Sequence, residues 1–414
     1  MTVSVVRPGK PRELHRYLVP LAVLYSGQFI ATGVIAALPA LLRQRGASLG
    51  EVGAISLVSF ATVAKIFWAP LVDRYGRYRS WLAFSQPAVV LTLAVLAALD
   101  LRGDFPVVFL AACVLIALVG TQDIATDALA VRLSGERERG AVNAIRVGAG
   151  FAGAIVGTSA TLIITQHWGW PWAATVVAAA GLVPLLVLRR LPGPAATPRA
   201  RHRPGLAEAA RILRRPGTLW WMGAILPLAW GGIMLAQSLL APMLVDQGWD
   251  LAWLSLLTSV LPGTAGIAGA AVAGRAMRRY SRRRTLLFAI AGEVVAMAAL
   301  LPVAFGRAEA VTFGAVVVLG AIRGVTNTVI FTVSMDLCRT ATAGSDFTLF
   351  SSWGYTIAIG AASLGPVLAG AWGYPATILA AVALTALSLF FVCTRFPLRQ
   401  APTPAGITAA GLDA

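Results

Sequence analysis

The sequence predicts an all-α polytopic membrane protein with twelve transmembrane helices in two pseudo-symmetric six-helix bundles. Of its 414 residues, 58% are hydrophobic and only 12% are charged, a balance outside that of ordinary soluble domains. Charged and Pro/Gly-rich breaks divide the chain into twelve apolar runs, each about the 17–25 residues that a helix needs to cross a bilayer. The two halves of the chain also resemble each other in sequence, which predicts the pseudo-symmetry.

The apolar runs alternate with segments whose basic residues fall mainly on one side of the bilayer. The runs lie near residues 17–42, 50–70, 81–100, 105–130, 140–165, 170–188, 218–243, 251–273, 285–304, 310–335, 344–371 and 374–394. With the N-terminus inside, the inner segments hold 27 Lys and Arg residues and the outer loops hold 4. By the positive-inside rule we expect both termini to be cytoplasmic. The first run is too long for a cleaved signal peptide, and we expect it to be the first span.

An internal repeat and one central linker define the expected domains. Trp168-Gly169-Trp170-Pro171 recurs as Trp372-Gly373-Tyr374-Pro375, an offset of 204 residues (372 − 168). The segment 189–217 is rich in Pro, Ala and Arg and contains no apolar run of membrane length. We therefore expect an N-terminal six-helix bundle in 1–188, a cytoplasmic linker in 189–217, a C-terminal six-helix bundle in 218–394 and a cytoplasmic tail in 395–414. This organisation predicts a site between the halves and alternating access by rocking.

A charged motif, Asp73-Arg74-Tyr75-Gly76-Arg77, follows the second apolar run. Asp73 can accept amide hydrogens or pair with an arginine, and the arginines are placed at the inner surface. The motif resembles the Asp-Arg-x-Gly-Arg loop of the major facilitator superfamily, although Trp68-Ala69-Pro70 replaces the usual initial glycine. The resemblance implies the major facilitator fold, and it makes Asp73, Arg74, Gly76 and Arg77 a conformational gating loop.

Other motifs narrow this resemblance to one branch of the superfamily. The pattern Lys-x-x-Trp-Ala-Pro-Leu-x-Asp at 65–73, Gln-Asp-x-x-x-Asp at 122–127 and the segments 324–328 and 335–338 are similar to the muropeptide-permease-like branch of peptide, acetyl-coenzyme A and drug transporters. Muropeptide permeases tend to be longer, with additional spans. The compact twelve-span chain is therefore most similar to siderophore permeases of the rhizobactin and pyochelin type.

Four charged residues are expected at similar depth within the N-terminal bundle. Asp123 and Asp127 lie four residues apart, so a helix places them on one face, and Lys65 and Arg146 lie in neighbouring spans. A charge inside the bilayer costs about 2.5–3.5 kcal/mol on insertion scales, which favours pairing. Three roles are open, and the first two are a buried ion-pair network that locks spans 2, 4 and 5 and a proton-coupling site in which one aspartate, the deeper Asp123 or else Asp127, exchanges a proton. Direct contact with substrate is a third.

Arg323 stands near the middle of the tenth span, where the resemblance to the superfamily places a helix that lines the cavity. A guanidinium at this depth needs a partner. An anionic substrate group, Glu293 of the ninth span, or an aspartate across the cavity would each serve. Asn327 lies one turn further along and is the repeat counterpart of Asp123 (327 − 123 = 204).

Polar and aromatic residues of the first, seventh and eleventh spans complete the expected substrate-binding lining. These residues are Tyr25, Gln28, Trp230, Gln237, Trp353 and Tyr355. Aromatic faces suit a flat, phenol-bearing iron chelate such as ferric pyochelin, but aromatic residues also pack in bundles and anchor spans at the interface.

Several classes of function are disfavoured by what the sequence lacks. It contains no GxxxxGK[ST] phosphate-binding loop, so we expect neither ATP hydrolysis nor a required ATPase subunit. The net charge of +17 is spread over short loops rather than one face, which argues against a nucleic-acid partner. The three histidines lie outside the cores of the spans, and we expect no enzyme activity, no cofactor and no metal site.

The resemblance and the charge pattern together predict a secondary transporter in the lipid bilayer of the bacterial cytoplasmic membrane. It would use the proton-motive force to import a ferri-siderophore, ferric pyochelin or a similar chelate. The alternative in the same family is a muropeptide or drug and metabolite permease. A third hypothesis, a membrane sensor or assembly factor that transports nothing, predicts that the intramembrane charges can be neutralised without loss of function.

Overall fold

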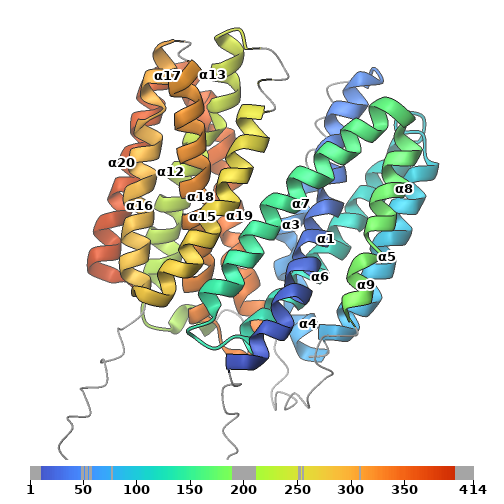
Figure 1. The fold of residues 1–414 in the computed structure, drawn as a ribbon, viewed down its shortest axis with the longest axis horizontal. Helices are drawn as coiled ribbons and strands as arrows, with labels where there is room; N and C mark the ends of the chain where they lie inside the picture. Colours follow the sequence, from blue (N-terminus) through green and yellow to red (C-terminus); the bar gives the residue numbers. More distant parts are fainter. Residues whose placement is uncertain are drawn as a thin grey trace, which may run out of the picture.

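The computed structural model describes residues 11–47, 51, 55, 58–75, 78–188, 211–249, 253, 256–306 and 309–396, and these are almost entirely helical (Figure 1). Eleven helical segments in the described ranges are long and apolar enough to cross a bilayer. The span expected at 50–70 is described only in part, as short helices. The prediction of an all-α polytopic membrane protein is confirmed.

The N-terminal group of helices is formed by residues 11–188. Its elements are α1 (Pro11–Gln44), η1 (Val58–Phe60), α3 (Ala61–Ala64), η2 (Lys65–Phe67), α4 (Ala69–Tyr75), α5 (Tyr78–Ala98), α6 (Phe105–Leu133), α7 (Arg139–Trp168), α8 (Trp170–Ala180) and α9 (Val183–Leu188). The helix is interrupted at Trp68, since α4 begins at Ala69 and Pro70 occupies its first turn, where a missing N–H is tolerated.

The C-terminal group is formed by residues 211–395. Its elements are η3 (Arg211–Arg214), α11 (Thr218–Trp220), the π-helix η4 (Trp221–Ile225), α12 (Leu226–Ser238), α13 (Leu240–Asp246), the π-helix η5 (Leu256–Val260), α15 (Leu261–Arg279), α16 (Arg282–Ala298), α17 (Leu301–Phe305), α18 (Glu309–Leu337), η6 (Thr340–Thr342), α19 (Ala343–Trp372) and α20 (Tyr374–Arg395).

The internal repeat extends to the lengths and ends of helices. Both α6 and α18 have 29 residues, and α18 begins 204 residues after α6 (309 − 105). Both α7 and α19 have 30 residues, and α19 begins 204 residues after α7 (343 − 139). Each of this second pair ends at a glycine with positive φ, Gly169 at +90° and Gly373 at +80°. Only glycine adopts this conformation at little cost, so the Trp-Gly-aromatic-Pro repeat encodes the same turn twice.

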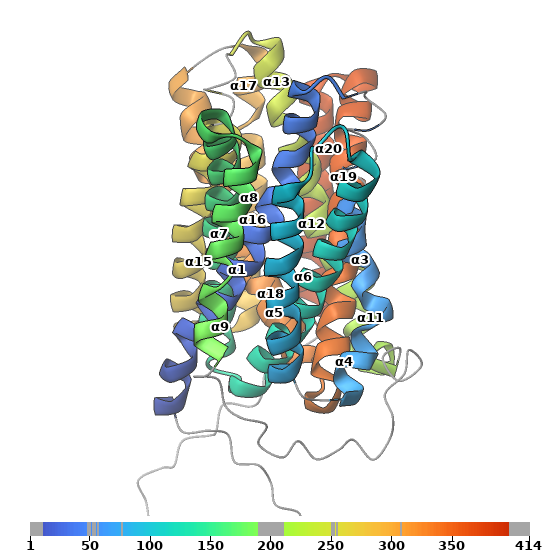
Figure 2. The same ribbon diagram turned by 90° about the vertical axis from the view of Figure 1, so that its right-hand side faces the viewer.

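The two groups lie closest to each other at the face where α1 begins and α20 ends, which we call the terminal face (Figure 1). They diverge toward the opposite face, which we call the far face. Figure 2 shows the N-terminal group in front, with α5, α8 and α9 nearest the viewer and the C-terminal group behind. Along the seam, α7 packs against α15 and α18, and α4 and α6 pack against α19. The seam therefore brings together the four helices of the repeat, α6, α7, α18 and α19.

Candidate functional site

The four charged residues expected in the N-terminal group form one connected network. Arg146 of α7 donates from Nε to Asp127 Oδ1 at 2.9 Å and from Nη2 to Asp127 Oδ2 at 3.1 Å. The same Nη2 lies 3.5 Å from Asp123 Oδ1. Lys65 of η2 pairs with the other oxygen of Asp123. Two cations thus balance two anions, and the network ties η2, α6 and α7 together.

Burial separates the two aspartates of this network. Asp127, Lys65 and Arg146 are no more than 2% exposed, whereas Asp123 is 14% exposed. Taking such charges out of water is costly, and good hydrogen-bond geometry is what offsets the cost. Asp127 has that geometry, because the Tyr25 hydroxyl also donates to its Oδ1 at 2.8 Å. Asp123 borders a small cavity of about 60 Å³.

Tyr25 and Gln28 of α1 both turn toward α6. Tyr25 is fully buried and holds Asp127, so it supports the network and lines neither of the two cavities described here. Gln28 donates from Nε2 to the Thr126 hydroxyl at 2.9 Å and also borders the small cavity. The expected lining role fits Gln28 but not Tyr25.

Aromatic rings of the C-terminal group cover the network from across the seam. The guanidinium of Arg146 lies 4.1 Å from the ring centroid of Phe331 and 5.2 Å from that of Phe347. The Lys65 ammonium lies 5.4 Å from the ring centroid of Tyr355. Cations over ring faces at these distances are attracted by the ring quadrupole. The N-terminal charges are therefore in contact with aromatic residues of the other half of the molecule.

A cavity of about 230 Å³ lies on the seam between α7 and the helices of the C-terminal group. Its wall is mostly apolar and aromatic, with two guanidinium groups and one amide. The lining residues are Phe29, Arg146, Val147, Gly150, Phe151, Ala154, Trp230, Met234, Arg323, Asn327, Phe331, Tyr355 and Ala358. A mainly apolar wall with a few polar groups is typical of a small-molecule site, and both charged groups here are cations.

Arg323 differs from Arg146 in having no acidic partner. Its guanidinium lies 5.5 Å from the ring centroid of Phe151, and its buried Nε has no hydrogen-bond partner within the described residues. The ion pair with Glu293, one of the three partners considered, is not formed in the part of the chain that the structure describes. The cavity thus contains a guanidinium with at least one buried donor that no described residue satisfies.

Asn327, Trp230 and Tyr355 form the opposite wall. The indole Nε1 of Trp230 donates to Asn327 Oδ1 at 2.7 Å, and its ring stacks on Tyr355 with centroids 6.0 Å apart. Trp230 also meets Phe331 edge to face at 5.4 Å. These contacts fix the indole and the amide together, so the three residues expected here do lie side by side in the cavity wall.

Gln237 and Trp353 line neither cavity, and their expected lining role does not fit. Trp353 is 40% exposed, and its Nε1 donates to the Met222 backbone oxygen at 2.7 Å. Trp353 and Tyr355 are two residues apart on α19, which separates their directions by about 200° on a helix. Because Tyr355 faces the cavity, Trp353 must face away from it.

The terminal face is closed by contacts between the halves. Asp73, at the end of α4, is buried and accepts hydrogen bonds from the Gly344 amide at 3.1 Å, the Ser345 amide at 2.6 Å and the Tyr78 hydroxyl at 2.6 Å. Of the expected gating loop, Arg74 is exposed, while Gly76 and Arg77 lie outside the described residues. Asp73 therefore joins the halves through backbone amides rather than through an arginine.

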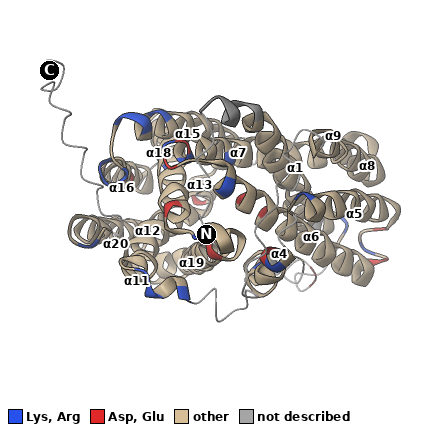
Figure 3. Ribbon diagram, turned by 90° about the horizontal axis from the view of Figure 1, so that it is seen from below, with Lys and Arg blue, Asp and Glu red and all other residues tan. Residues whose placement is uncertain are grey.

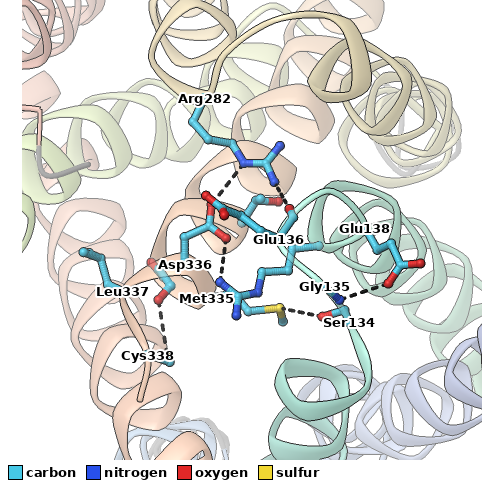
Figure 4. Close-up of polar contacts among 12 residues, drawn as sticks. Ser134, Gly135, Glu136, Glu138, Arg282, Met335, Asp336, Leu337 and Cys338 are labelled. Atoms are coloured by element: carbon cyan, nitrogen blue, oxygen red, sulfur yellow. Dashed lines mark hydrogen bonds and ion pairs between the residues drawn. The ribbon is translucent and has the colours of Figure 1, made fainter. Parts of the chain in front are cut away.

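A second contact between the halves centres on Asp336 at the end of α18 (Figure 4). Its two oxygens pair with Arg139 Nη1 at 2.8 Å and with Arg282 Nε at 3.0 Å. Arg282 also donates to the backbone oxygen of Glu136, so it reaches from the C-terminal group to the loop before α7 (Figure 4). Asp336 was not among the expected site residues. It lies at the C-terminal end of α18, where the partial negative charge of the helix disfavours an acid unless a cation is nearby, and the two arginines provide that cation.

Phe29, Phe151 and Phe331 were also not expected in the site. Phenylalanine is as apolar as its neighbours in a membrane span, so a search for polar residues does not identify it. The constant repeat offset is the one signal that could have found Phe331, since it is the counterpart of Asp127 (331 − 127 = 204). Among the described residues, no group of three or more His, Cys, Asp or Glu side chains is placed to hold a metal ion.

Comparison with known proteins agrees with this architecture. Residues 21–363 match the sequence profile of the Major Facilitator Superfamily. The chain is 28% identical over 362 residues to the anhydromuropeptide permease of Escherichia coli (strain K12). The alignment covers 83% of this chain and 73% of the relative.

Two solved structures show the same fold. A crystal structure of the Escherichia coli fucose:proton symporter has a TM-score of 0.72 at 16% identity and covers 92% of this chain and 98% of its own. A bacterial homologue of the iron transporter ferroportin has a TM-score of 0.67 at 13% identity, with the same coverage of both chains. Taken with the two helical groups and the cavity on their seam, the sequence match shows that this chain belongs to the major facilitator superfamily, as a multi-pass secondary transporter rather than an enzyme.

Proposed function

We propose that this protein is a proton-driven importer of an organic anion of the muropeptide type across the bacterial cytoplasmic membrane. The observation that carries the proposal is Arg323, a guanidinium without an acidic partner in the described chain, in the wall of a cavity between the halves. A fixed cation with unused donors in an apolar site is suited to a carboxylate. Phe151, Trp230 and Tyr355 offer ring faces to the apolar parts of the same solute.

The class of solute is taken from the sequence relative. The named relative is an anhydromuropeptide permease, and the match spans most of both chains. It favours the muropeptide alternative over the ferri-siderophore expected from overall similarity and length. A ferri-siderophore such as ferric pyochelin remains the second candidate, because the aromatic wall and the arginine also fit a flat anionic chelate.

The orientation follows from the distribution of charge. Basic residues are concentrated in the segments at the terminal face, where Figure 3 shows Lys and Arg near α4, α11 and α16. By the positive-inside rule this face is cytoplasmic, which places both termini inside. The contacts of Asp73 and Asp336 close this face, and the helices diverge toward the far face (Figure 1), so we assign the structure to a conformation that is closed to the cytoplasm.

The charge network suits the role of a lock better than that of a proton carrier. Asp123 and Asp127 each have a cation within ion-pair distance, and the four charges cancel. Removing a proton from, or adding one to, such a balanced cluster leaves a buried charge unpaired, which is costly. We therefore assign Lys65, Asp123, Asp127 and Arg146 to holding the helices of the N-terminal group together as it moves.

The test is uptake by cells that lack their own muropeptide and siderophore permeases. Cells with and without this protein are given radiolabelled anhydromuropeptide or iron-loaded pyochelin, before and after addition of a protonophore. We expect anhydromuropeptide uptake that requires the protein and collapses with the proton gradient. Uptake of the iron chelate alone would establish the second candidate. Absence of any uptake from cells whose membranes contain the protein would support a sensor or assembly factor.

Arg323→Gln provides the residue-level test of the same proposal. Loss of a charge-assisted hydrogen bond costs about 1.5–3 kcal/mol, so affinity for the anion should fall about 10- to 100-fold. Arg275→Gln is the matched control, because Arg275 is an exposed arginine near the end of α15. Equal affinities of Arg323→Gln and the unaltered protein would remove Arg323 from the binding site.

A further inference from the structure

One fully buried acid of the described chain, Glu293, has neither an ion-pair partner nor a role in the proposed function. Glu293 lies in the middle of α16, eleven residues after Arg282 and therefore about 16 Å along the helix from the terminal face. It is 0% exposed, and α16 packs between α18 and α20. The polar neighbour of its carboxyl group is the Thr326 hydroxyl of α18. Neither carboxyl oxygen completes a hydrogen bond with any described residue.

Every other buried acid in the described chain has a stabilising partner. Asp73 is bound by backbone amides, Asp123 and Asp127 by the network, Asp336 by two arginines, and Asp346 by Arg339 at 2.6 Å. An unpaired carboxylate in an apolar bundle is strongly disfavoured, whereas the neutral acid loses far less on burial. The form of Glu293 that fits this conformation is therefore the protonated one.

The charged groups around Glu293 leave one candidate to influence it. All titratable residues of α15 and α20 are at the ends of those helices, either the first residue or among the last five, whereas Glu293 is in the middle of α16. The helix α12 has no titratable residue. Within α18, Glu309 and Asp336 lie at the two ends. Arg323, in contrast, is three residues from Thr326, a rise of about 4.5 Å along the helix. The two groups without partners, one acid and one base, thus lie at nearly the same level of the bundle.

We infer that Glu293 binds the proton that is transported with the solute. This inference rests on the proposed function, because it requires an anion at Arg323. While Arg323 is free, its positive charge lowers the fraction of molecules in which Glu293 is protonated; when the solute anion occupies Arg323, that influence is neutralised and the protonated fraction rises as Glu293 takes up protons from water. Reciprocity then requires that protonation of Glu293 strengthens binding of the anion.

The cycle that follows is balanced in charge and atoms. One O–H bond forms at Glu293 when the anion arrives from the outside, and the same bond breaks when the anion leaves for the cytoplasm. The anion and the proton enter and leave together, so the loaded cavity changes conformation without an added unpaired charge. No other reactant is needed.

The first test does not depend on the identity of the solute. The infrared spectrum of the purified protein in lipid should contain the carbonyl stretch of a buried protonated carboxylic acid. We expect this band to be lost in Glu293→Gln, which preserves size and shape, and to shift in Glu293→Asp. The same band should persist in Asp123→Asn and in the control Glu309→Gln, whose side chain is exposed. A band that persists unchanged in Glu293→Gln would overturn the inference.

The second test measures coupling. Anhydromuropeptide added to weakly buffered, purified protein should remove protons from the medium, as reported by a pH-sensitive dye. Glu293→Gln should lose this proton uptake and the concentrative transport that depends on it, while solute binding and solute exchange across liposomes persist. Glu309→Gln should retain all of these activities. Proton uptake that persists in Glu293→Gln would overturn the inference even if the proposed function holds. If the unaltered protein does not bind the solute, the proposed function fails and the infrared result decides the protonation of Glu293 separately.

Discussion

The Asp73 carboxylate lies at the first turn of α19, where it accepts a 2.6 Å hydrogen bond from the backbone amide of Ser345. The first amides of a helix have no partner within the helix, and their partial positive charge favours an anion. Asp73 supplies that anion from the other half of the molecule. The contact exists only while the terminal face is closed, so it stabilises one conformation selectively.

Asp73→Asn should therefore shift the conformational equilibrium away from the closed terminal face. The amide side chain lacks the charge and has only one acceptor oxygen, so at least one charge-assisted hydrogen bond is lost. At about 1.5–3 kcal/mol for such a bond, the population ratio should change about 10- to 100-fold. Arg74→Gln, next in sequence but exposed, is the matched control.

The shift can be measured by distances between spin labels across the far face. Suitable positions are His167 at the end of α7 and Val311 at the start of α18, both exposed. The labels are introduced as cysteines after the three native cysteines are replaced. Asp73→Asn should increase the population with short far-face distances, and a distribution identical to that of Arg74→Gln would mean that Asp73 does not hold the closed state.

Asp336→Asn should weaken the same closure by a separate route. Its carboxylate pairs with both Arg139 and Arg282, and each of these arginines is only 14% exposed. Coupling energies for such pairs are expected to be about 1–3 kcal/mol, as for residues in one salt-bridge network. The measurement is a double-mutant cycle with Arg139→Gln and Arg282→Gln, with far-face distances as the readout. If the change in the free energy of closure caused by Asp336→Asn adds fully to that caused by either arginine variant, the ion pairs contribute nothing to closure.

Asp127→Asn should destabilise the fold more than Asp123→Asn does. Breaking a buried pair by removing one partner costs about 3–5 kcal/mol, and Asp127 is the better buried and more fully bonded of the two. Thermal unfolding in detergent is the measurement. Lys65→Met combined with Asp123→Asn removes both charges of one pair and should recover much of the stability lost in Asp123→Asn alone.

This double variant also tests what the network does in transport. If Lys65 and Asp123 only hold helices together, the combined neutral variant should keep proton-coupled uptake. Loss of coupling with solute binding intact would instead restore Asp123 as the proton carrier and would contradict the role inferred for Glu293.

Gly354→Ala should damage the binding cavity without altering any charge. A Cβ atom at residue 354 would lie 1.8 Å from Cζ3 of Trp230, so the indole must move and its bond to Asn327 must break. Overpacking of this kind costs about 1–3 kcal/mol, and solute affinity should fall with it. Gly360→Ala on the same helix is the control, because nothing lies within 4 Å of a Cβ atom there. Equal solute affinities of the two variants would mean that the Trp230 position does not matter.

Much of the fold was predictable because the bilayer limits what a chain can do. Span length, the positive-inside pattern and the repeat offset are all read directly from residue order. They predict where each helix lies in the sequence, how it is oriented in the membrane and which helix is its repeat counterpart, but not which side chains touch. The same is true of the charge network. Asp123 and Asp127 could be placed on one helix face from spacing alone, and buried charges must find opposite charges, for which Lys65 and Arg146 were available.

The cavity was less predictable because it depends on how each helix is rotated about its axis. Span length does not set rotation, so Trp353 and Tyr355 were both expected in the wall although they point in different directions. The partner of Arg323 was also open, since an anionic substrate group, Glu293 or an aspartate across the cavity could each have served. The structure forms none of these pairs within the described residues, and it leaves Arg323 and Glu293 separate.

The offset of 204 residues also pairs each residue of the charge network with a position in the C-terminal half. The counterparts of Lys65, Asp127 and Arg146 in the second half are Gly269, Phe331 and Phe350, so each of these charges corresponds to a neutral residue at the equivalent position. Phe331 now covers Arg146, the cation that its counterpart Asp127 binds from the other side. The two halves thus share one plan of helices but differ in charge: the N-terminal half contains the ion-pair network, and the C-terminal half covers it with aromatic side chains.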